Sequence, residues 1–325
     1  MEKLAIIGSG LSGLTLATLL KSKFEITVFD KARGVGGRLA ARRTGPFTFD
    51  HGAQYFTART EAFRDFIKPL IDLGVIKKWT ARHVEVDGAQ IVKRSYWESE
   101  EPRYVGVPNM NSIAKQMAQN INVKTNIKID SILRKDYWQL EDEHGGIHKD
   151  FDWVISTAPA PQTLQILPKN FVHHALIKRI EMRGCYSLML GFSEIFPLEF
   201  EAAHVLNSDV SWIAVNSHKP QRGSLQTMVI HSSAEYAEKN MDIDRNIVIN
   251  HLCQETSSII QHDATQAIRQ VLHGWRYANN AKRDIYKPFI DHDLKIAACG
   301  DWCLGGRVEG AFTSAQNLAH ALETG

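Results

Sequence analysis

The first thirty residues alternate between apolar runs and turn residues in the order strand, helix, strand. Leu4–Ile7 is a continuous apolar run, which is typical of a strand buried on both faces of a parallel sheet. Apolar residues recur with helical spacing through Leu11–Leu20, and Phe24–Phe29 returns to strand alternation and ends at Asp30. The pattern predicts a βαβ unit of about thirty residues.

Later segments have the pattern of further parts of the same sheet. Residues 152–161 form a short apolar run that stops at a Thr-Ala-Pro turn, and residues 294–302 form another that ends in Gly-Asp before a final amphipathic helix. Residues 121–151 alternate like strands around a turn at 144–146, which favours a small antiparallel meander. The expected fold class is therefore α/β, a parallel sheet with helices and a β-meander.

Two remaining regions are richer in Trp, Tyr, His and Met, and they mix helical stretches with strands such as Ser187–Phe192 and Gln226–His231. We assign these regions to a second, discontinuous α+β domain inserted twice into the first. The expected boundaries are residues 1–59, 106–166 and 278–325 for the first domain, and residues 60–105 and 167–277 for the second.

Composition argues against several classes of binding partner and indicates a cellular compartment. The 325 residues are 44% hydrophobic and 23% charged with a net charge of +2, which favours neither a nucleic-acid footprint nor a polybasic membrane anchor. No apolar run approaches the ~20 residues of a membrane span. The four cysteines are scattered without a CxxC pair, and the fourteen histidines include no HExxH. We expect a cytoplasmic protein without a metal site, acting as a monomer or weak dimer.

The turn after the first strand has the spacing of a dinucleotide-binding motif. In "GSGLSG", Gly8 permits a tight turn, Gly10 lets the backbone approach a pyrophosphate, and Gly13 allows the helix to pack closely on the strand. The helix N-terminus then faces the phosphates. Asp30 follows twenty residues after Gly10 and is placed to accept hydrogen bonds from a ribose diol.

The segment after Asp30 favours FAD over NAD. In "DKARGVGGR", two adjacent glycines precede Arg38, a pattern that suggests backbone packed against another part of an extended ligand, with a guanidinium near its phosphates. A basic solvated loop is the alternative, and it suits Arg42 and Arg43 better than Arg38.

Here the sequence resembles the FAD-dependent oxidoreductases of the amine oxidase and glutathione reductase-like group. Their glycine motif, acid and R-x-G-G-R-like segment are matched by "DKARGVGGR", and "CGDWCLGGRVEGAFTSAQ" resembles their last FAD motif. The resemblance implies a Rossmann-like FAD-binding domain, a substrate domain and non-covalent FAD, with the amides near Val308–Ala311 stabilising negative charge on the reduced flavin. The expected FAD contacts are Gly8, Gly10, Leu11, Ser12, Gly13, Asp30, Lys31, Arg33, Gly37, Arg38, Gln54, Tyr55, Ile129, Asp301, Val308, Glu309 and Gly310.

Within that group the sequence is similar to the bacterial renalases over nearly its whole length. The matching segments include "FDHGAQYFTAR", "RYVGVPNM", "STAPAPQ", "VIHSSAEY", "GWRYA" and "GDWCLGGRVEGA". The resemblance implies an oxidase that converts the 2- and 6-dihydro isomers of NAD(P)H to NAD(P)+ by hydride transfer to flavin N5, after which dioxygen reoxidises the flavin and gives hydrogen peroxide. Hydride loss restores an aromatic ring, so no proton need be removed.

The same resemblance implies the residues of the substrate site. His231 and Trp275 are expected to face the substrate ring as the catalytic residues. Each also has a purely structural explanation, as a core histidine or a packed aromatic residue, and Arg59 equally suits a loop cap or an ion pair. The substrate-binding residues implied are Tyr55, Phe56, Thr57, Ala58, Arg59 and Trp302.

Three positions complicate the resemblance. Cys185 stands where a threonine is expected and Tyr104 where a tryptophan is expected, and both changes fall near the implied pocket. Cys303 raises the question of a covalent flavin thioether, but its position ahead of the last helix does not fit that pattern.

Two other functions stay open from the sequence. A flavin amine oxidase acting on a small amine or polyamine needs an aromatic cage, which Tyr55 and Trp275 could supply. A protein that has lost the flavin and binds protein partners, as the Rab GDP-dissociation inhibitors have, is disfavoured by the intact Asp30, Arg38 and Asp301. NAD and NADP isomers are equally compatible with the motifs.

Overall fold

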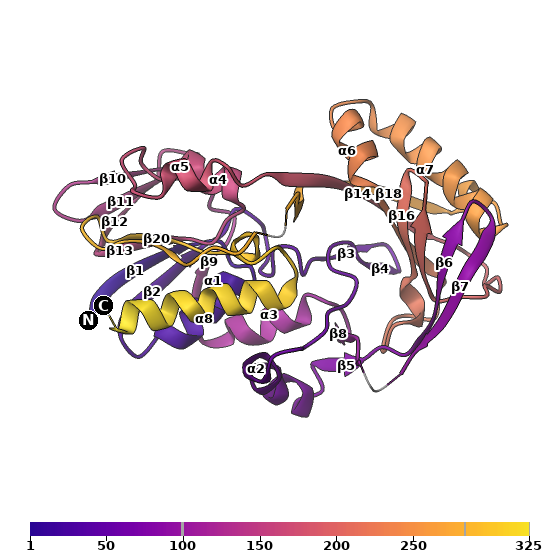
Figure 1. Ribbon diagram of the computed structural model, residues 1–325, viewed down its shortest axis with the longest axis horizontal. Coiled ribbons are helices and arrows are strands. Elements are labelled where there is room, and N and C mark those ends of the chain that lie inside the picture. The colour runs from indigo at the N-terminus through magenta and orange to yellow at the C-terminus, as the bar shows by residue number, and fades with distance from the viewer. Residues whose placement is uncertain (99–100, 283, 325) are drawn as a thin grey trace.

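The computed structural model describes residues 1–98, 101–282 and 284–324. Two sheets lie at opposite ends of the molecule, and the long strand β14 (Met182–Gly191) leads from one lobe into the other (Figure 1). Each sheet has its own buried apolar cluster. The fold is thus α/β with two lobes.

The six-stranded sheet of the first lobe is parallel except at one edge. Its buried central strand pairs in parallel with a neighbour on each side, which explains the unbroken apolar run at Leu4–Ile7. The strands in spatial order are β19 (Phe289–Asp291), β20 (Ile296–Ala298), β13 (Trp153–Ser156), β1 (Glu2–Ile7), β2 (Phe24–Phe29) and β9 (Asn122–Lys124), with β19 antiparallel to β20.

Helices cover one face of this sheet and a meander covers the other (Figure 1). On the first face α1 (Leu11–Leu20) packs against α8 (Val308–Thr324) and the short α3 (Ser112–Met117). On the second face the meander packs with two short helices. These elements are β10 (Ile129–Arg134), β11 (Trp138–Asp142), β12 (Ile147–Phe151), α4 (Ala160–Ile166) and α5 (His174–Ile177).

The second lobe is built on a seven-stranded sheet, antiparallel except where β15 and β6 run parallel. One face packs on α6 (Ala234–Asn240) and α7 (Arg245–Ile260). The other face looks toward the hairpin β3–β4 (Ala41–Thr44, Phe47–Asp50). The strands in spatial order are β18 (Arg269–Asn280), β14, β17 (Thr227–Ser232), β16 (Val210–Val215), β15 (Ala202–Leu206), β6 (Ala81–Asp87) and β7 (Gln90–Trp97).

The remaining elements lie between these strands and helices along the chain. Helix α2 begins at a Thr60 side-chain cap and packs on α8. The bounds of these elements are α2 (Glu61–Asp72), β5 (Ile76–Lys78), β8 (Tyr104–Gly106), η1 (Ala118–Asn120), η2 (Asn216–His218), η3 (Ala264–Gln266) and η4 (Asp301–Cys303).

The first βαβ unit and the last helix form where the apolar pattern predicts them. One strand differs: residues 122–124 join the parallel sheet beside β2, whereas the sequence pattern placed them in the meander. Alternation alone does not state which neighbour a strand pairs with. The domain boundaries given above stay a prediction.

Candidate active site

The glycine turn between β1 and α1 is built by close backbone contacts. Gly8 has φ +110°, and a Cβ added at Gly13 would lie 2.0 Å from the carbonyl oxygen of Gly8. A Cβ added at Gly10, in contrast, would meet no atom within 4 Å. The first amides of α1 lack intrahelical acceptors by helix geometry. The turn therefore presents open space and N–H donors on the Gly10 side, which suits a pyrophosphate.

The acid at the end of β2 is held against this turn. Asp30 Oδ2 accepts hydrogen bonds from the backbone N–H and the hydroxyl of Ser9, at 2.7 and 2.6 Å. Lys31 and Arg33, which follow it, are exposed. Asp30 Oδ1 accepts the Ala32 N–H at 2.8 Å and keeps a second lone pair. Asp30 is thus oriented by the protein and keeps acceptor capacity for a ligand hydroxyl.

The glycines before Arg38 pack directly on the nucleotide turn. The Gly36 N–H donates to the Ser9 carbonyl at 2.9 Å. A Cβ added at Gly37, whose φ is +53°, would lie 3.3 Å from Gly10 Cα. This loop therefore lies beside the glycine turn, as a segment that shares an extended ligand with it should.

Arg38 and Asp301, which are predicted separately from the two ends of the chain, bind each other. The Arg38 guanidinium contacts both carboxylate oxygens of Asp301, with an Nη1–Oδ2 distance of 2.9 Å, and also donates to the Ala278 carbonyl at 3.0 Å. The bidentate pair holds both charged groups in a defined orientation. It fixes the loop after β2 against the segment ahead of α8.

The N-terminus of α8 faces the segment after Gln54. Arg307, which precedes the helix, has φ +75°, a conformation that costs energy for a residue with a Cβ. The Glu309 carboxylate accepts the backbone N–H groups of Arg59 and Thr60. Val308, Glu309 and Gly310 form the first turn, where helix geometry leaves N–H groups without intrahelical acceptors.

Candidate substrate residues come from one face of the seven-stranded sheet. Trp212, His231, Ser187 and His273 occupy opposed positions on β16, β17, β14 and β18 and so form a row across it. Two residues further along, Cys185 opposes Trp275. The Cys185 departure therefore lies directly beside a predicted catalytic residue.

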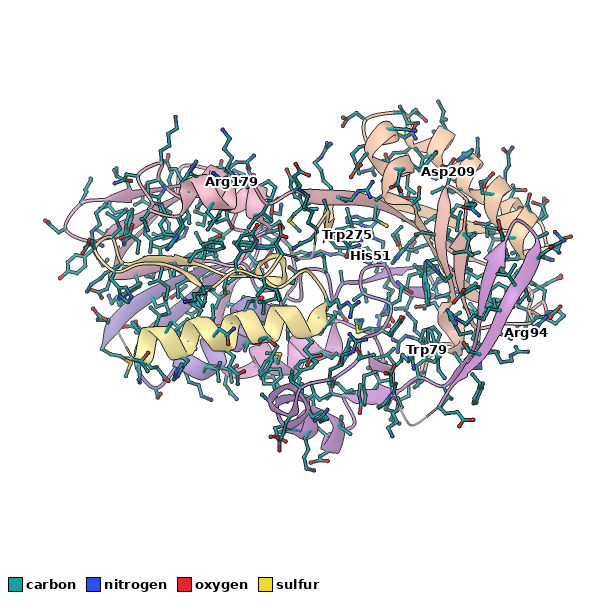
Figure 2. The ribbon with its side chains drawn as sticks, in the orientation of Figure 1. His51, Trp79, Arg94, Arg179, Asp209 and Trp275 are labelled. Carbon is teal, nitrogen blue, oxygen red and sulfur yellow. The ribbon has the colours of Figure 1, made fainter. Side chains whose placement is uncertain are left out.

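Trp275 sits within a cluster of histidines between the two sheets (Figure 2). Its indole N–H donates to the His51 carbonyl at 2.8 Å, and its ring stacks on the His51 imidazole with centroids 5.4 Å apart. Burial lowers the pKa of His51 to about 3, and it lowers the pKa values of His231 and His273 to about 4. All three imidazoles are therefore neutral at pH 7.

Gln54 links His231 to a buried charged group that sequence reasoning missed. The Gln54 Nε2 lies 3.3 Å from His231 Nε2, and its Oε1 accepts from Lys219 Nζ at 3.0 Å. The Lys219 side chain has 0% exposure, and Asp50 binds both Lys219 and Arg222. In the sequence Lys219 lies in "NSHKPQR", which has no distinctive spacing, so no signal there could have indicated its burial.

Tyr55, which follows Gln54 in the chain, lies in a cluster of aromatic rings. The Tyr55 ring lies 4.9 Å from Trp97 and 5.8 Å from Trp212, measured between centroids, and burial raises its pKa. The Arg103 guanidinium lies 4.9 Å from the Trp97 ring centroid. Phe56, which is buried, exchanges backbone hydrogen bonds with Tyr104 in the same cluster, and Thr57 and Ala58 follow it at partly exposed positions.

The structure places Trp302 away from the expected substrate pocket. Its side chain is fully buried in the core of the first lobe and stacks on Phe289, while its indole N–H donates to the Ala158 carbonyl. Trp302 therefore packs the core of the lobe, and the expectation that it contacts substrate is not met. Ile129 is also buried in that core, at the start of β10.

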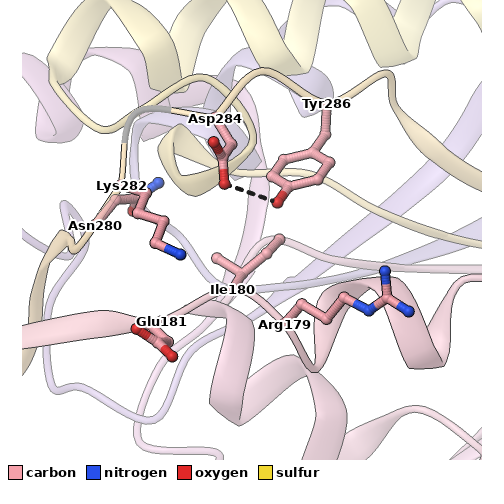
Figure 3. A pocket seen from close by; sticks show the side chains of 7 residues that line it. All are labelled: Arg179, Ile180, Glu181, Asn280, Lys282, Asp284 and Tyr286. Atoms are coloured by element: carbon pink, nitrogen blue, oxygen red, sulfur yellow. Dashed lines mark hydrogen bonds between the residues drawn. The ribbon is translucent and has the colours of Figure 1, made fainter.

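A small hollow lies outside these clusters, near the ends of β14 and β18. Its volume of about 10 Å³ is close to that of one water, which is too small for a substrate. Tyr286 donates to Asp284 across it at 3.2 Å (Figure 3). The residues that line it are Arg179, Ile180, Glu181, Asn280, Lys282, Asp284 and Tyr286.

Two family sequence models match the chain. Residues 6–70 match the model described as an NAD(P)-binding Rossmann-like domain, and residues 85–322 match the one described as flavin containing amine oxidoreductase. The second match covers well over half of the chain.

Individual proteins are similar at low identity. Renalase of Mus musculus is 22% identical over 99% of both chains. A 1-hydroxycarotenoid 3,4-desaturase of Flavobacterium sp. is 41% identical over 87 residues, which are 26% of this chain and 18% of the desaturase.

Solved structures show the same fold. A structure from Exiguobacterium sp., described as "Putative protoporphyrinogen oxidase", has a TM-score of 0.79 at 12% identity and covers 99% of this chain and 98% of that one. Putrescine oxidase bound to putrescine has a TM-score of 0.71 at 12% identity, with 100% and 99% covered.

Proposed function

Since the chain belongs to the flavin containing amine oxidoreductase family, and is thus a FAD-binding flavoprotein, we propose that it oxidises the 2- and 6-dihydro isomers of NAD(P)H to NAD(P)+. The reaction is the one that the likeness to renalases implies. Bound FAD supplies the hydride acceptor at N5, and dioxygen as the second substrate would take the electrons and give hydrogen peroxide.

The first lobe supplies the groups that FAD needs. The open side of Gly10 and the N-terminus of α1 suit the pyrophosphate, and Asp30 suits a ribose diol. Arg38, held by Asp301, would place positive charge near the phosphates. The N-terminus of α8 would stabilise negative charge on the pyrimidine side of the flavin. Cys303 is buried in the core of this lobe, which supports non-covalent binding.

One observation carries the choice of reaction: the imidazoles around Trp275 are too weakly basic to remove protons at neutral pH. The pKa of His231 is about 4 and that of His51 is about 3, both because of burial. Oxidation of a dihydropyridine needs only hydride loss, because aromaticity is restored without deprotonation. Trp275 and His231 would then act by positioning the ring.

The second candidate, oxidation of a small amine, draws on a different observation. The tilted aromatic rings around Tyr55 resemble the cage that such a substrate requires, and putrescine oxidase shares the fold. An ammonium substrate must lose a proton before hydride transfer, however, and the neutral imidazoles supply no base of suitable pKa.

Anaerobic mixing distinguishes the two reactions. We expect the flavin absorbance to bleach rapidly with 6-dihydro-NAD and not with putrescine or benzylamine. Admission of oxygen should restore the absorbance and release one hydrogen peroxide per flavin. Bleaching by the amines but not by 6-dihydro-NAD would contradict the proposal.

The same proposal includes a location in the cytoplasm. All four cysteines are unpaired in the described part of the chain, which suits a reducing compartment such as the cytoplasm. Among the described residues no helix is long and apolar enough to cross a membrane.

A further inference from the structure

The buried charges behind Gln54 do not cancel. Lys219 and Arg222 are cations whose side chains are 0% and 1% exposed, and Asp50 is the carboxylate that both contact, at 3.4 and 2.5 Å. Asp50 Oδ1 is already occupied by the Met110 N–H at 2.8 Å. Two cations and one carboxylate leave one net positive charge in a water-excluded position, where charges act over longer distances than in water.

The Gln54 side chain lies between this charge and the candidate substrate face. Lys219 Nζ can only donate, so it must face Gln54 Oε1, while the carbonyls of Asp50 and Gly52 accept from Gln54 Nε2 at 2.6 and 3.0 Å. The carboxamide orientation is therefore fixed by its partners. Both Nε2 hydrogens are directed at those two carbonyls, and His231 Nε2 lies 3.3 Å from the same nitrogen, so Gln54 packs between Lys219 and His231.

We propose that Lys219 is a specificity-determining cation, which makes the face formed by His231 and Trp275 favour uncharged rings over cationic ones. This inference rests on the proposed function, in which a neutral dihydropyridine enters and a pyridinium cation leaves. The buried charge opposes entry of protonated amines and weakens retention of the cationic product. The charged groups that act on Lys219 are Asp50 from β4 and Arg222 from its own segment, and the Trp79 ring lies 5.3 Å from Nζ.

Two ligands that differ in charge but share a ring test this role. Nicotinamide is uncharged, and 1-methylnicotinamide carries a fixed positive charge. Their dissociation constants for oxidised holoenzyme can be measured at pH 6.5 from flavin absorbance changes and by calorimetry. We expect the wild type to bind nicotinamide at least tenfold more tightly than 1-methylnicotinamide.

Matched variants separate charge from structure. In Lys219→Met the preference should fall at least fivefold, whereas Lys219→Arg should keep it. Arg222→Met removes the same charge but leaves the bond to Gln54, so its effect should be smaller. If Lys219→Met does not fold, Lys219→Gln gives the same charge removal with a donor to Gln54 retained.

An unchanged preference in the folded, uncharged variant overturns the inference, as does the absence of binding of both ligands to every form. Bleaching of the wild type by 6-dihydro-NAD is measured separately. If that bleaching occurs while Lys219→Met leaves the preference for nicotinamide over 1-methylnicotinamide unchanged, this inference fails and the proposed function stands. If it does not occur, the proposed function itself fails.

Discussion

The nucleotide turn and the histidine–tryptophan face are assembled from the chain in opposite ways. The turn depends mainly on backbone: Gly8, Gly10 and Gly13 lie within six residues, and Gly8 and Gly13 approach main-chain atoms and the Thr157 hydroxyl, while Gly10 faces open space. The candidate substrate face depends on side chains from β14, β17, β18 and the 51–54 segment, and within it His51 and Trp275 are 224 residues apart in the sequence. Binding of a common cofactor can therefore be encoded locally, whereas substrate choice depends on the packing of distant strands.

The largest expected effect comes from filling the closest backbone contact in the turn. Gly13→Val places side-chain atoms where a Cβ alone would lie 2.0 Å from Gly8 O. Because backbone cannot yield by that amount without moving α1, we expect FAD affinity to fall by at least about 100-fold. Fluorescence titration of the apoprotein with FAD measures it. Gly34→Ala, where no atom lies within 4 Å of an added Cβ, serves as the control.

The second prediction concerns the buried charges next to the candidate substrate face. Asp50→Asn leaves Lys219 and Arg222 buried without their carboxylate. Breaking a buried ion pair in this way costs about 3–5 kcal/mol, so the free energy of unfolding should drop by that order. Urea denaturation followed by tryptophan fluorescence gives the value, and the exposed Asp136→Asn should change it by less than about 0.5 kcal/mol. A drop equal to that of the control would show that the three charges do not form one unit.

A smaller loss is expected at the pair that joins the two ends of the chain. Arg38→Ala removes the bidentate contact with Asp301 and a charge expected near the phosphates. Hydrogen bonds to charged groups contribute about 1.5–3 kcal/mol, so FAD affinity should fall roughly 10- to 100-fold. Arg43→Ala, on an exposed side chain, should leave it unchanged. The double variant Asp30→Ala and Arg38→Ala should lose still more, and full retention of FAD by it would contradict the assignment.

The smallest expected effect is the dependence of the free energy of unfolding on pH that the buried histidines cause. The folded pKa values of His51 and His231 lie below the ordinary histidine value of 6.5, so the unfolded chain binds more protons between pH 6.5 and about 4. Stability should therefore be lost as pH falls through that range. Each such histidine contributes up to about 1.4 kcal/mol per pH unit.

Denaturation midpoints at pH 7, 6 and 5 measure this slope. His51→Gln should reduce it, while the exposed His144→Gln should not. Equal slopes for the wild type and His51→Gln would mean that His51 is not held neutral by burial.

The first lobe was predictable because its determinants are local. The apolar run at Leu4–Ile7, the helical spacing of Leu11–Leu20 and the three glycines all act within one βαβ unit. Arg38 and Asp301 could each be named from their own motifs. What no local pattern could state was that they bind each other, because their partnership depends on how two distant loops fold back on the sheet.

The sequence by itself determined the α/β class and the glycine turn with its acid, and it predicts that a histidine and a tryptophan face a substrate. Only the tertiary structure decided that Trp302 packs a core, that three imidazoles are kept neutral, and that Lys219 stands behind Gln54. The physical reason is burial. Desolvation sets the charge of a histidine or lysine, and it depends on all the chain segments packed around a residue rather than on its neighbours in sequence.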